Sequence, residues 1–308
     1  MRFIRLFLSL LALSQFTLPT LAYADEGNRL IVMGGSSLGI RDSSKQDTEI
    51  TFNAALADLL KSHGANLVVK VFDSTQDLYK AFDNNEIDGI FGTPLEFIQR
   101  ESKMKNSFLA VHYKNVPLAQ PFLVLVRTDD NIKNIKELRG KKCSIKPTQD
   151  MELLFLNTLL LENQQPESGT FFSDRLNPKN TNTGMMDVFF GKSDLTIVRE
   201  SEYKTAVELN PQLGKKLTVL TKSDPFLVLI GGAKDNMPES SHQAAVDTLT
   251  QLSSTDKGMQ LMRVIHADSF EPASKSDLNN VRGLLKRYQT LKTKQVVTPR
   301  SRVQSAAN

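Results

Sequence analysis

The chain has 308 residues and a formal net charge of +4, but that charge belongs to its two ends. Without Arg2 and Arg5, and without the six basic residues that follow Leu285, the body of the chain carries about −4. The basic balance is therefore no argument for binding to nucleic acid. The single cysteine, Cys143, excludes an internal disulfide.

The first 24 residues predict a secretory signal peptide. Arg2 and Arg5 form a basic head, residues 6–13 an apolar run, and Ala22-Tyr23-Ala24 a small-x-small cleavage signal. The run is too short to span a bilayer, and no later segment approaches about 18 consecutive apolar residues. We expect cleavage near Ala24 and Asp25, and a soluble mature protein in a bacterial periplasm.

Beyond the signal peptide, strands and helices alternate in two similar blocks. The first block predicts strands at 29–35, 66–72 and 87–92, with helices at 48–65 and 73–85 between them. The second predicts strands at 122–126, 142–145, 169–174 and 194–200, with helices before Gly140, from about Asp150, and at 183–192. A returning strand at 224–232 and helices at 241–254, 256–265 and 274–291 complete the chain.

Strands that alternate with helices pair in parallel through right-handed crossovers. We therefore predict an α/β fold of two lobes, each an open and mainly parallel sheet flanked by helices, with a ligand cleft between the lobes. Lobe 1 is assigned to residues 25–120 and lobe 2 to residues 121–234. Residues 235–290 are predicted to be helices that mostly return to lobe 1, and residues 291–308 to be a disordered basic tail.

The two blocks contain matching corners between a strand and a helix. Asp88 precedes a strand that ends in Gly92-Thr93-Pro94, and Asp194 precedes a strand that ends in Arg199-Glu200-Ser201. Ligands of such sheets bind beyond the carboxyl ends of strands, near helix N-termini. With two further corners at 34–39 and 146–150, this predicts a set of ligand-binding residues: Ser36, Ser37, Thr93, Thr148, Gln149, Asp150, Arg199 and Glu200.

Each of these residues also has a purely structural interpretation. Arg199 suits a two-point grip on a carboxylate or phosphate, or a salt bridge to Glu200, Glu202 or another acid. Glu200 suits a ligand amine, although we favour a role in holding Arg199. Thr93 and Thr148 suit ligand hydrogen bonds or helix capping.

Three stretches, 77–99, 123–145 and 254–285, resemble the periplasmic solute-binding proteins of the phosphate, phosphite and phosphonate class. Proteins of this class capture the substrate of ABC importers with a type II binding-protein fold. The likeness extends from about Leu30 to Tyr288. It implies a soluble clamp that closes on a small solute and then meets a membrane permease.

The chain departs from the family where the ligand is held. The family's Ser/Thr-rich helix start corresponds here to "IKPTQDME" (residues 145–152), which keeps only the hydroxyl of Thr148 and adds the carboxyl of Asp150. A carboxylate there repels a dianion unless it is protonated or paired. The resemblance therefore implies the capture of a small anionic solute, phosphonate-like or another oxyanion, without naming it.

Other functions have weaker support. Residues 35–39 match the G-x-S-x-G pattern, with Ser37 as nucleophile and His242 or His266 as base, but too little chain precedes it to build the sheet that this elbow needs. The four histidines lack metal-ligand spacing. We expect no catalytic residue, no metal and no cofactor. The partner is a permease of an ABC transporter or, as the alternative, a membrane sensor kinase or cyclase.

Overall fold

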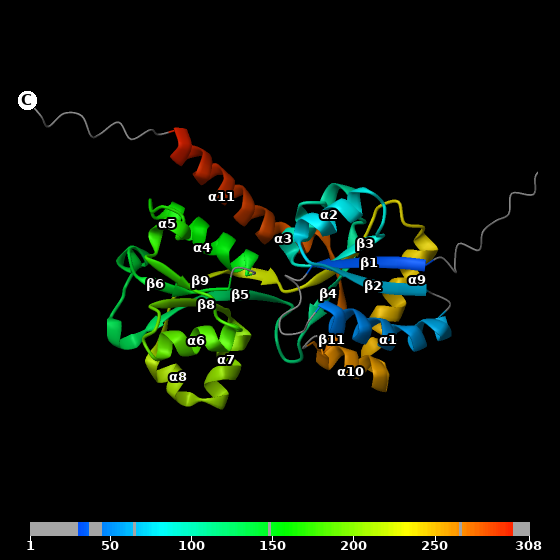
Figure 1. Ribbon diagram of the computed structural model, residues 1–308, viewed down its shortest axis with the longest axis horizontal. Helices are drawn as coiled ribbons and strands as arrows, with labels where there is room; N and C mark the ends of the chain where they lie inside the picture. Colours follow the sequence, from blue (N-terminus) through cyan, green and yellow to red (C-terminus); the bar gives the residue numbers. More distant parts are fainter. Residues whose placement is uncertain (1–29, 37–44, 64–65, 147–148, 265–266, 298–308) are drawn as a thin grey trace, which may run out of the picture.

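The computed structural model describes residues 30–36, 45–63, 66–146, 149–264 and 267–297. These residues form two lobes side by side (Figure 1). The predicted signal peptide, Ser37, Thr148 and residues 298–308 lie outside the described residues. Within the described part of the chain, no helix is both long and apolar enough to cross a membrane.

Lobe 1 is built on a six-stranded sheet in the order β11-β4-β10-β3-β1-β2. Its strands are β1 (Leu30–Ser36), β2 (Asn66–Phe72), β3 (Gly89–Gly92), β4 (Ser107–His112), β10 (Ile230–Ala233) and β11 (Ser269–Ser274). The helices beside it are α1 (Lys45–His63), α2 (Thr75–Asp83), α3 (Pro94–Ile98), α9 (Glu239–Thr250) and α10 (Asp256–Val264). Two separate parts of the chain therefore build this lobe.

Lobe 2 is built on a five-stranded sheet in the order β7-β6-β8-β5-β9. Its strands are β5 (Ala119–Arg127), β6 (Lys142–Ser144), β7 (Asp174–Leu176), β8 (Leu195–Arg199) and β9 (Leu217–Leu227). Its helices are α4 (Asp150–Glu162), α5 (Ser168–Phe171), α6 (Thr181–Phe189), α7 (Glu200–Leu209) and α8 (Pro211–Lys216). The last helix of the chain, α11 (Asn279–Val297), follows β11.

The repeat seen in the sequence is a repeat of topology. The parallel strands β2-β1-β3 of lobe 1 match β7-β6-β8 of lobe 2. The paired aspartates have the same task in each lobe: Asp88 Oδ2 accepts the N–H of Val32 (2.9 Å), and Asp194 Oδ2 accepts the N–H of Lys142 (2.8 Å). Each carboxyl thus ties the third strand of its block to the first.

The two-lobed α/β fold agrees with the prediction, but both sheets are mixed and not mainly parallel. Beside the parallel strands, β10 runs antiparallel to β3 and β4, and β5 runs antiparallel to β8 and β9. The reason is the crossing between lobes. A strand that arrives from the other lobe joins the edge of the parallel set without a crossover helix, and therefore in the opposite direction.

Four local predictions were wrong. Residues 169–174 form the short helix α5 followed by the start of β7. The single strand expected at 224–232 is divided into β9 and β10, one in each lobe. The segment 269–274, expected within a helical remainder, is the edge strand β11. The tail expected to be disordered from residue 291 continues α11 as far as Val297.

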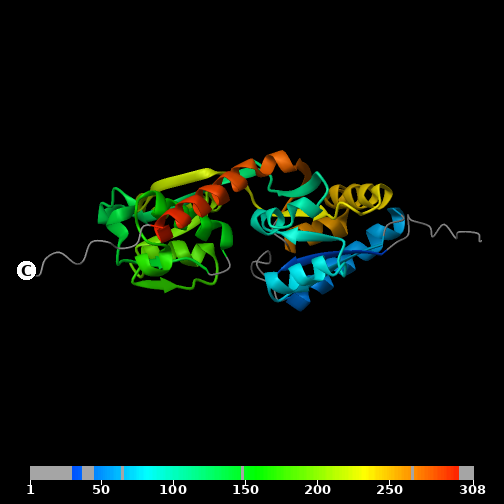
Figure 2. The ribbon, with the colours of Figure 1, turned by 90° about the horizontal axis from the view of Figure 1, so that it is seen from above.

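Helix α11 also packs where the sequence did not place it. It leaves lobe 1 and crosses to lobe 2, as both views of the ribbon show (Figures 1 and 2). Val281 and Leu284 are buried in the core of lobe 2, in the same apolar cluster as Leu156 and Leu160 of α4. At its start, Arg282 pairs with Glu101 of lobe 1. The helix therefore connects the two lobes, in addition to the two segments in which the chain passes from one lobe to the other.

Each sheet separates two layers of apolar side chains. Along β5, Phe122 and Val124 enter the core beneath α4 and α11, and Leu123 and Leu125 enter the core beneath α6 and α7. Successive side chains of a strand point to opposite faces, so an apolar run of this kind is buried on both sides. This accounts for the unbroken "FLVLV" in the sequence.

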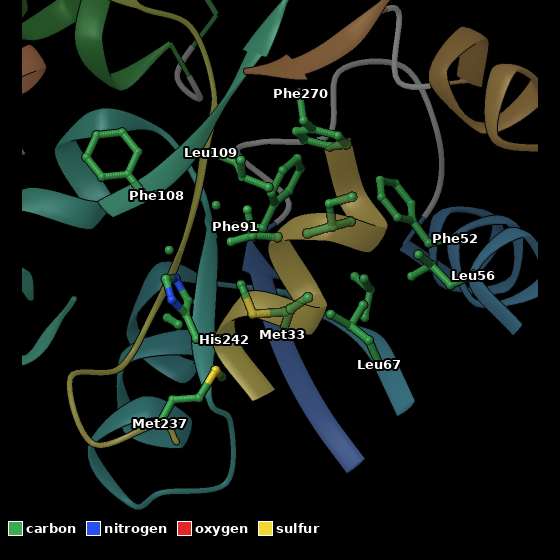
Figure 3. A pocket seen from close by; sticks show the side chains of 17 residues that line it. Met33, Phe52, Leu56, Leu67, Phe91, Phe108, Leu109, Met237, His242 and Phe270 are labelled. Atoms are coloured by element: carbon green, nitrogen blue, oxygen red, sulfur yellow. The ribbon is translucent and has the colours of Figure 1, made fainter. Parts of the chain in front are cut away.

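Lobe 1 contains a small cavity of about 50 Å³ between its sheet and the helices α1 and α9. Its walls include Met33, Phe52, Phe91 and Phe270, with His242 at one side (Figure 3). Almost all of the lining is apolar. Such a cavity offers a polar solute too few hydrogen bonds, so it is a packing feature of the lobe.

Phe270 provides a test of this core. Its side chain is buried, and its ring lies edge-on to Phe91 with centroids 5.8 Å apart. Phe270→Ala enlarges the existing cavity, and we expect it to lower the free energy of unfolding by about 3–5 kcal/mol in urea titrations. Pro272→Ala, at an exposed position of the same strand, is the control and should change it by less than about 1 kcal/mol. Equal effects would contradict the assignment.

Candidate functional site

The corner of lobe 1 lies where β3 ends and α3 begins. Thr93 is the N-cap of α3: its Oγ1 accepts the N–H of Glu96 (3.3 Å), and Glu96 Oε2 accepts the N–H of Thr93 (2.9 Å). This reciprocal capping box satisfies two backbone donors at once. Gly92 leaves room for the Glu96 carboxyl, which a side chain at this position would displace.

Glu96 accepts hydrogen bonds from the hydroxyl groups of this corner. The residue is 2% exposed, and its Oε1 accepts hydrogen bonds from Ser36 Oγ (2.5 Å) and Thr75 Oγ1 (3.0 Å). The hydroxyl of Tyr79 donates to the Glu96 carbonyl (3.2 Å), and burial together with the Glu96 charge raises the pKa of Tyr79. Strand β1 and helices α2 and α3 are thereby held together around one carboxyl group.

The corner of lobe 2 lies at the start of α4. The side chain of Gln149 turns back to accept the N–H of Lys146 (2.9 Å), and its amide donates to Glu152 Oε1 and to the carbonyl of Ile197 (each 3.4 Å). Asp150 is the first residue of the helix, and its Oδ1 accepts the N–H of Met151 (2.8 Å). An acidic residue in the first helical turn is favoured by the helix dipole.

The two corners touch. Thr93 Oγ1 donates a hydrogen bond to Asp150 Oδ2 across the lobes, at 2.8 Å. Burial raises the pKa of Asp150 to about 6, and the charge of Glu96 acts in the same direction, whereas the bond from Thr93 acts against it. This carboxyl therefore gains a proton within the weakly acidic range.

Arg199 ends β8 at the position that Thr93 has in the other block. Its side chain is 11% exposed; Nη2 lies 3.9 Å from Glu152 Oε1, and Nη1 lies 3.7 Å from Glu202 Oε1. The N–H of Arg199 donates to Glu202 Oε2 (2.9 Å), which matches the bond from Thr93 to Glu96. The guanidinium is thus held between two carboxyl groups of its own lobe.

Glu200 does not hold Arg199, contrary to our favoured interpretation. Its Oε2 lies 3.4 Å from Lys204 Nζ, one turn further along α7. The first residue of a helix points its side chain along the helix surface, where the residue four positions on is its neighbour. Glu202, at the third position, is the one that reaches back to the start of the helix.

The structure thus brings together five of the eight predicted residues. Ser36 and Thr93 meet at Glu96, Thr93 meets Asp150 across the lobes, and Gln149 and Arg199 meet at Glu152. Ser37 and Thr148 lie outside the described residues. Glu200 points to Lys204.

Of the three glutamates that organise these contacts, sequence reasoning missed Glu96 and Glu152 and named Glu202 only as a possible salt-bridge partner of Arg199. A signal existed for two of them: Glu96 and Glu202 stand three residues after Thr93 and Arg199, which is the capping-box spacing. Glu152 gave no such signal. Its 3% exposed side chain follows from the packing of α4 beside β8.

Two of the residues considered for hydrolysis, Ser37 and His266, lie outside the described residues. Ser36 donates its hydroxyl to a carboxyl group, and His242 lies elsewhere in lobe 1, with its Nδ1 3.3 Å from Glu239 Oε1. Among the residues that the structure describes, no group of three or more His, Cys, Asp or Glu side chains is placed to hold a metal ion.

Comparison with known proteins identifies the family. A family model for the periplasmic substrate-binding proteins of phosphonate ABC transporters matches residues 40–278. The chain belongs to this family. Membership confirms the resemblance seen in the sequence and makes the protein the substrate-binding component of an ABC importer, which works in the periplasm with a membrane permease. A sequence comparison with curated proteins gives no match.

Solved structures agree on the fold of this binding protein. A Xanthomonas citri protein bound to ATP superposes with a TM-score of 0.64 at 12% identity, over 86% of this chain and 98% of the other. The binding component of a phosphonate ABC transporter from Pseudomonas aeruginosa gives 0.62 at 12% identity, over 87% and 89%. PhnD1 from Prochlorococcus marinus, in complex with methylphosphonate, gives 0.60 at 12% identity, over 85% and 99%.

The pKa of Asp150 predicts how the stability of the binding protein depends on pH. Because this pKa is about 6 in the folded protein and 3.8 in the unfolded reference, folding favours the protonated form. The stabilisation is complete below about pH 4 and is lost as the pH rises through about 6, by up to about 3 kcal/mol. Asp150→Asn keeps a neutral acceptor for Thr93 and should remove this dependence.

We therefore expect Asp150→Asn to melt at a higher temperature than the wild type at pH 7, with the difference vanishing near pH 4. Thermal unfolding across this range measures it. Asp174→Asn removes one negative charge from an exposed position of the same lobe and serves as the control. Parallel profiles for the wild type and Asp150→Asn would show that Asp150 titrates normally.

Removing Glu96 tests the corner of lobe 1. Glu96→Ala leaves Ser36 Oγ, Thr75 Oγ1 and the N–H of Thr93 without their acceptor. We expect it to lower the free energy of unfolding by about 3 kcal/mol or more in urea. Glu86→Ala, at an exposed position, should remain within about 0.5 kcal/mol of the wild type. A small effect of Glu96→Ala would mean that water replaces the carboxyl.

Proposed function

We propose that this binding protein captures a small oxyanion between the corners of its two lobes and delivers it in the closed form to its permease. The observation that carries this proposal is the hydrogen bond from Thr93 to Asp150. It brings the start of α3 in lobe 1 against the start of α4 in lobe 2. A solute held there contacts both lobes, which is the requirement for a ligand that stabilises closure.

The proposed binding groups come from both sides. Lobe 1 supplies the hydroxyl of Thr93, and lobe 2 supplies the amide of Gln149, the guanidinium of Arg199 and the carboxyl of Asp150. Ser36 is fully buried and donates to Glu96, so its proposed part is to support this corner from behind. Ser37 and Thr148 remain predictions. Arg199 has a planar fork that matches an oxyanion, and Glu152 and Glu202 keep it in place without covering all of it, since 11% of its side chain stays exposed.

Closure is proposed to bend the chain where it passes between lobes. The first crossing lies between His112 and Ala119, and the second between Leu227 and Ile230. Helix α11 is anchored on both lobes, so its start at Arg282 must shift against Glu101, or its later turns against α4, as the lobes rotate. Hinge bending of this kind needs changes in only a few backbone angles.

We further propose that the protein performs no chemistry on its solute. Two observations support this proposal. Ser36 donates its hydroxyl hydrogen to Glu96, and the described residues of the site include no histidine beside that hydroxyl. A membrane sensor, the alternative partner, is not needed for a member of an importer family.

A thermal-shift panel tests the proposal. The purified protein, freed of carried-over ligand by unfolding and refolding, is heated with phosphate, phosphite, methylphosphonate, carboxylates or amino acids at pH 7. A solute at about 100 times its Kd adds about 2.7 kcal/mol, which raises the melting temperature by a few degrees. We expect this for an oxyanion and expect no comparable effect from the amino acids.

The variant Arg199→Lys tests whether a thermal shift arises from the proposed site. The lysine keeps the charge but loses the planar fork, so the shift should fall to less than half. Arg139→Lys, at an exposed position before β6, should preserve the full shift. If no solute of the panel stabilises the wild type, or if the two lysine variants respond alike, the proposed site is wrong.

A further inference from the structure

Gln120 is a buried amide at the point where the chain enters lobe 2. It is the second residue of β5, and it is 3% exposed. Neither its Nε2 nor its Oε1 has a hydrogen-bond partner among the described residues. The other buried side chains of β5, those of residues 122–126, are all apolar. Because nearly all buried polar side chains in proteins are hydrogen-bonded, an amide with both atoms unpaired requires an explanation.

The strand register places this amide between the apolar cores of the two lobes. Its partner on β9, Phe226, packs against Phe122 with ring centroids 5.6 Å apart, within the core of lobe 2. The adjacent pair of the same ladder, Ala119 and Leu227, packs against the core of lobe 1. Gln120 therefore lies where the lobes meet, beside both segments in which the chain passes from one lobe to the other.

The register also makes Gln120 a neighbour of Arg199. Arg199 pairs with Phe122 across β8 and β5, and its guanidinium carbon lies 5.8 Å from the centroid of the Phe122 ring. Side chains alternate between the faces of a strand, so Gln120 shares the face of Phe122. It is thus a diagonal neighbour of Arg199, at a Cα separation of roughly 7–8 Å that long side chains can span. Because β8 ends at Arg199, Gln120 lies beyond that end, toward the cleft.

The fold itself gives no reason for an amide at this position. Backbone groups make the ladder of β5, and the side chains beside Gln120 on its face, Phe122 and Phe226, are apolar. An apolar side chain of the same size would avoid the cost of taking an amide out of water without a partner. Residues that break a local rule in this way are expected at functional sites. The neighbouring guanidinium of Arg199 indicates that the site concerned is the one proposed to hold the solute.

We propose that Gln120 is a solute-binding residue, and that an N–H of its amide donates to an oxygen of the oxyanion held by Arg199. This inference rests on the proposed function and adds the start of β5 to its binding groups. The amide offers two N–H donors and adds no charge beside the guanidinium. Separation of the lobes uncovers the amide, and closure on a solute gives it a partner. The hydrogen bond therefore belongs to the liganded closed form and stabilises it.

Gln120→Met tests the role in binding, because methionine is of nearly the same length and has no N–H group. Calorimetric titration of the refolded, solute-free protein with phosphate and with methylphosphonate at pH 7 measures the affinities. We expect the variant to bind the tighter of these two probes at least about tenfold more weakly than the wild type does, because a hydrogen bond to a charged group is lost. Gln212→Met, at an exposed position of α8, is the matched control and should keep the wild-type affinity.

The melting temperature of the solute-free protein is a second readout, and it should move in the opposite direction. If the amide has no partner within the protein, an apolar side chain of similar size removes an unpaired polar group. Gln120→Met should therefore melt at least about 1–2 °C above the wild type, and Gln212→Met should melt with the wild type. A residue whose role is only structural would lower the melting temperature when it is replaced.

The possible failures are distinguishable. An affinity of Gln120→Met within about twofold of the wild type overturns the role in binding and leaves the proposed function standing. A Gln120→Met variant that melts below the wild type, or does not fold, shows that the fold itself requires the amide, and this also overturns the inference. Absence of binding of both probes by the wild type, together with a flat thermal-shift panel, removes the proposed function and this inference with it.

Discussion

The hydrogen bond between Thr93 and Asp150 is the contact on which the architecture of the site depends. It joins two helix starts that the chain separates by 57 residues and that belong to different sheets. A helix start carries unsatisfied N–H groups and partial positive charge, so two such ends approach each other readily only with an acceptor between them. The carboxyl of Asp150 is that acceptor, and its burial is the cost of the arrangement.

Carboxyl groups also organise the corners themselves. Glu96 and Glu202 occupy the third position of α3 and α7 and accept the N–H of the residue before each helix. The duplicated design places different side chains at that preceding position, Thr93 in lobe 1 and Arg199 in lobe 2. One lobe therefore presents a hydroxyl and the other a guanidinium, and in the proposed site these are two chemically different sides for a solute.

The buried carboxyl of Asp150 distinguishes this site from one that is lined only by hydrogen-bond donors. Burial of a carboxyl is unfavourable for stability. The raised pKa of Asp150 measures that cost. Groups with strongly perturbed pKa values cluster at functional sites. The chain balances the cost elsewhere, with apolar layers on both faces of each sheet and with α11, which packs on lobe 2 while its start remains tied to lobe 1.

The sequence by itself determined the two blocks, the lobes and the corners, because these follow from local patterns. Apolar runs, glycine turns and helix starts are written within a few residues, and the paired Asp88 and Asp194 marked equivalent strands. Capping-box spacing would also have indicated Glu96 and Glu202. The resemblance to the binding-protein family could be recognised for the same reason, because short stretches of the sequence carry it.

Only the tertiary structure decided which of these groups meet. The donation from Thr93 to Asp150, the pairing of Arg199 with Glu152, and the packing of α11 on lobe 2 all join residues far apart in the chain. The same is true of the antiparallel strands, whose direction depends on how the chain crosses between lobes. Burial and partner choice arise from packing of distant segments, and no local pattern encodes them.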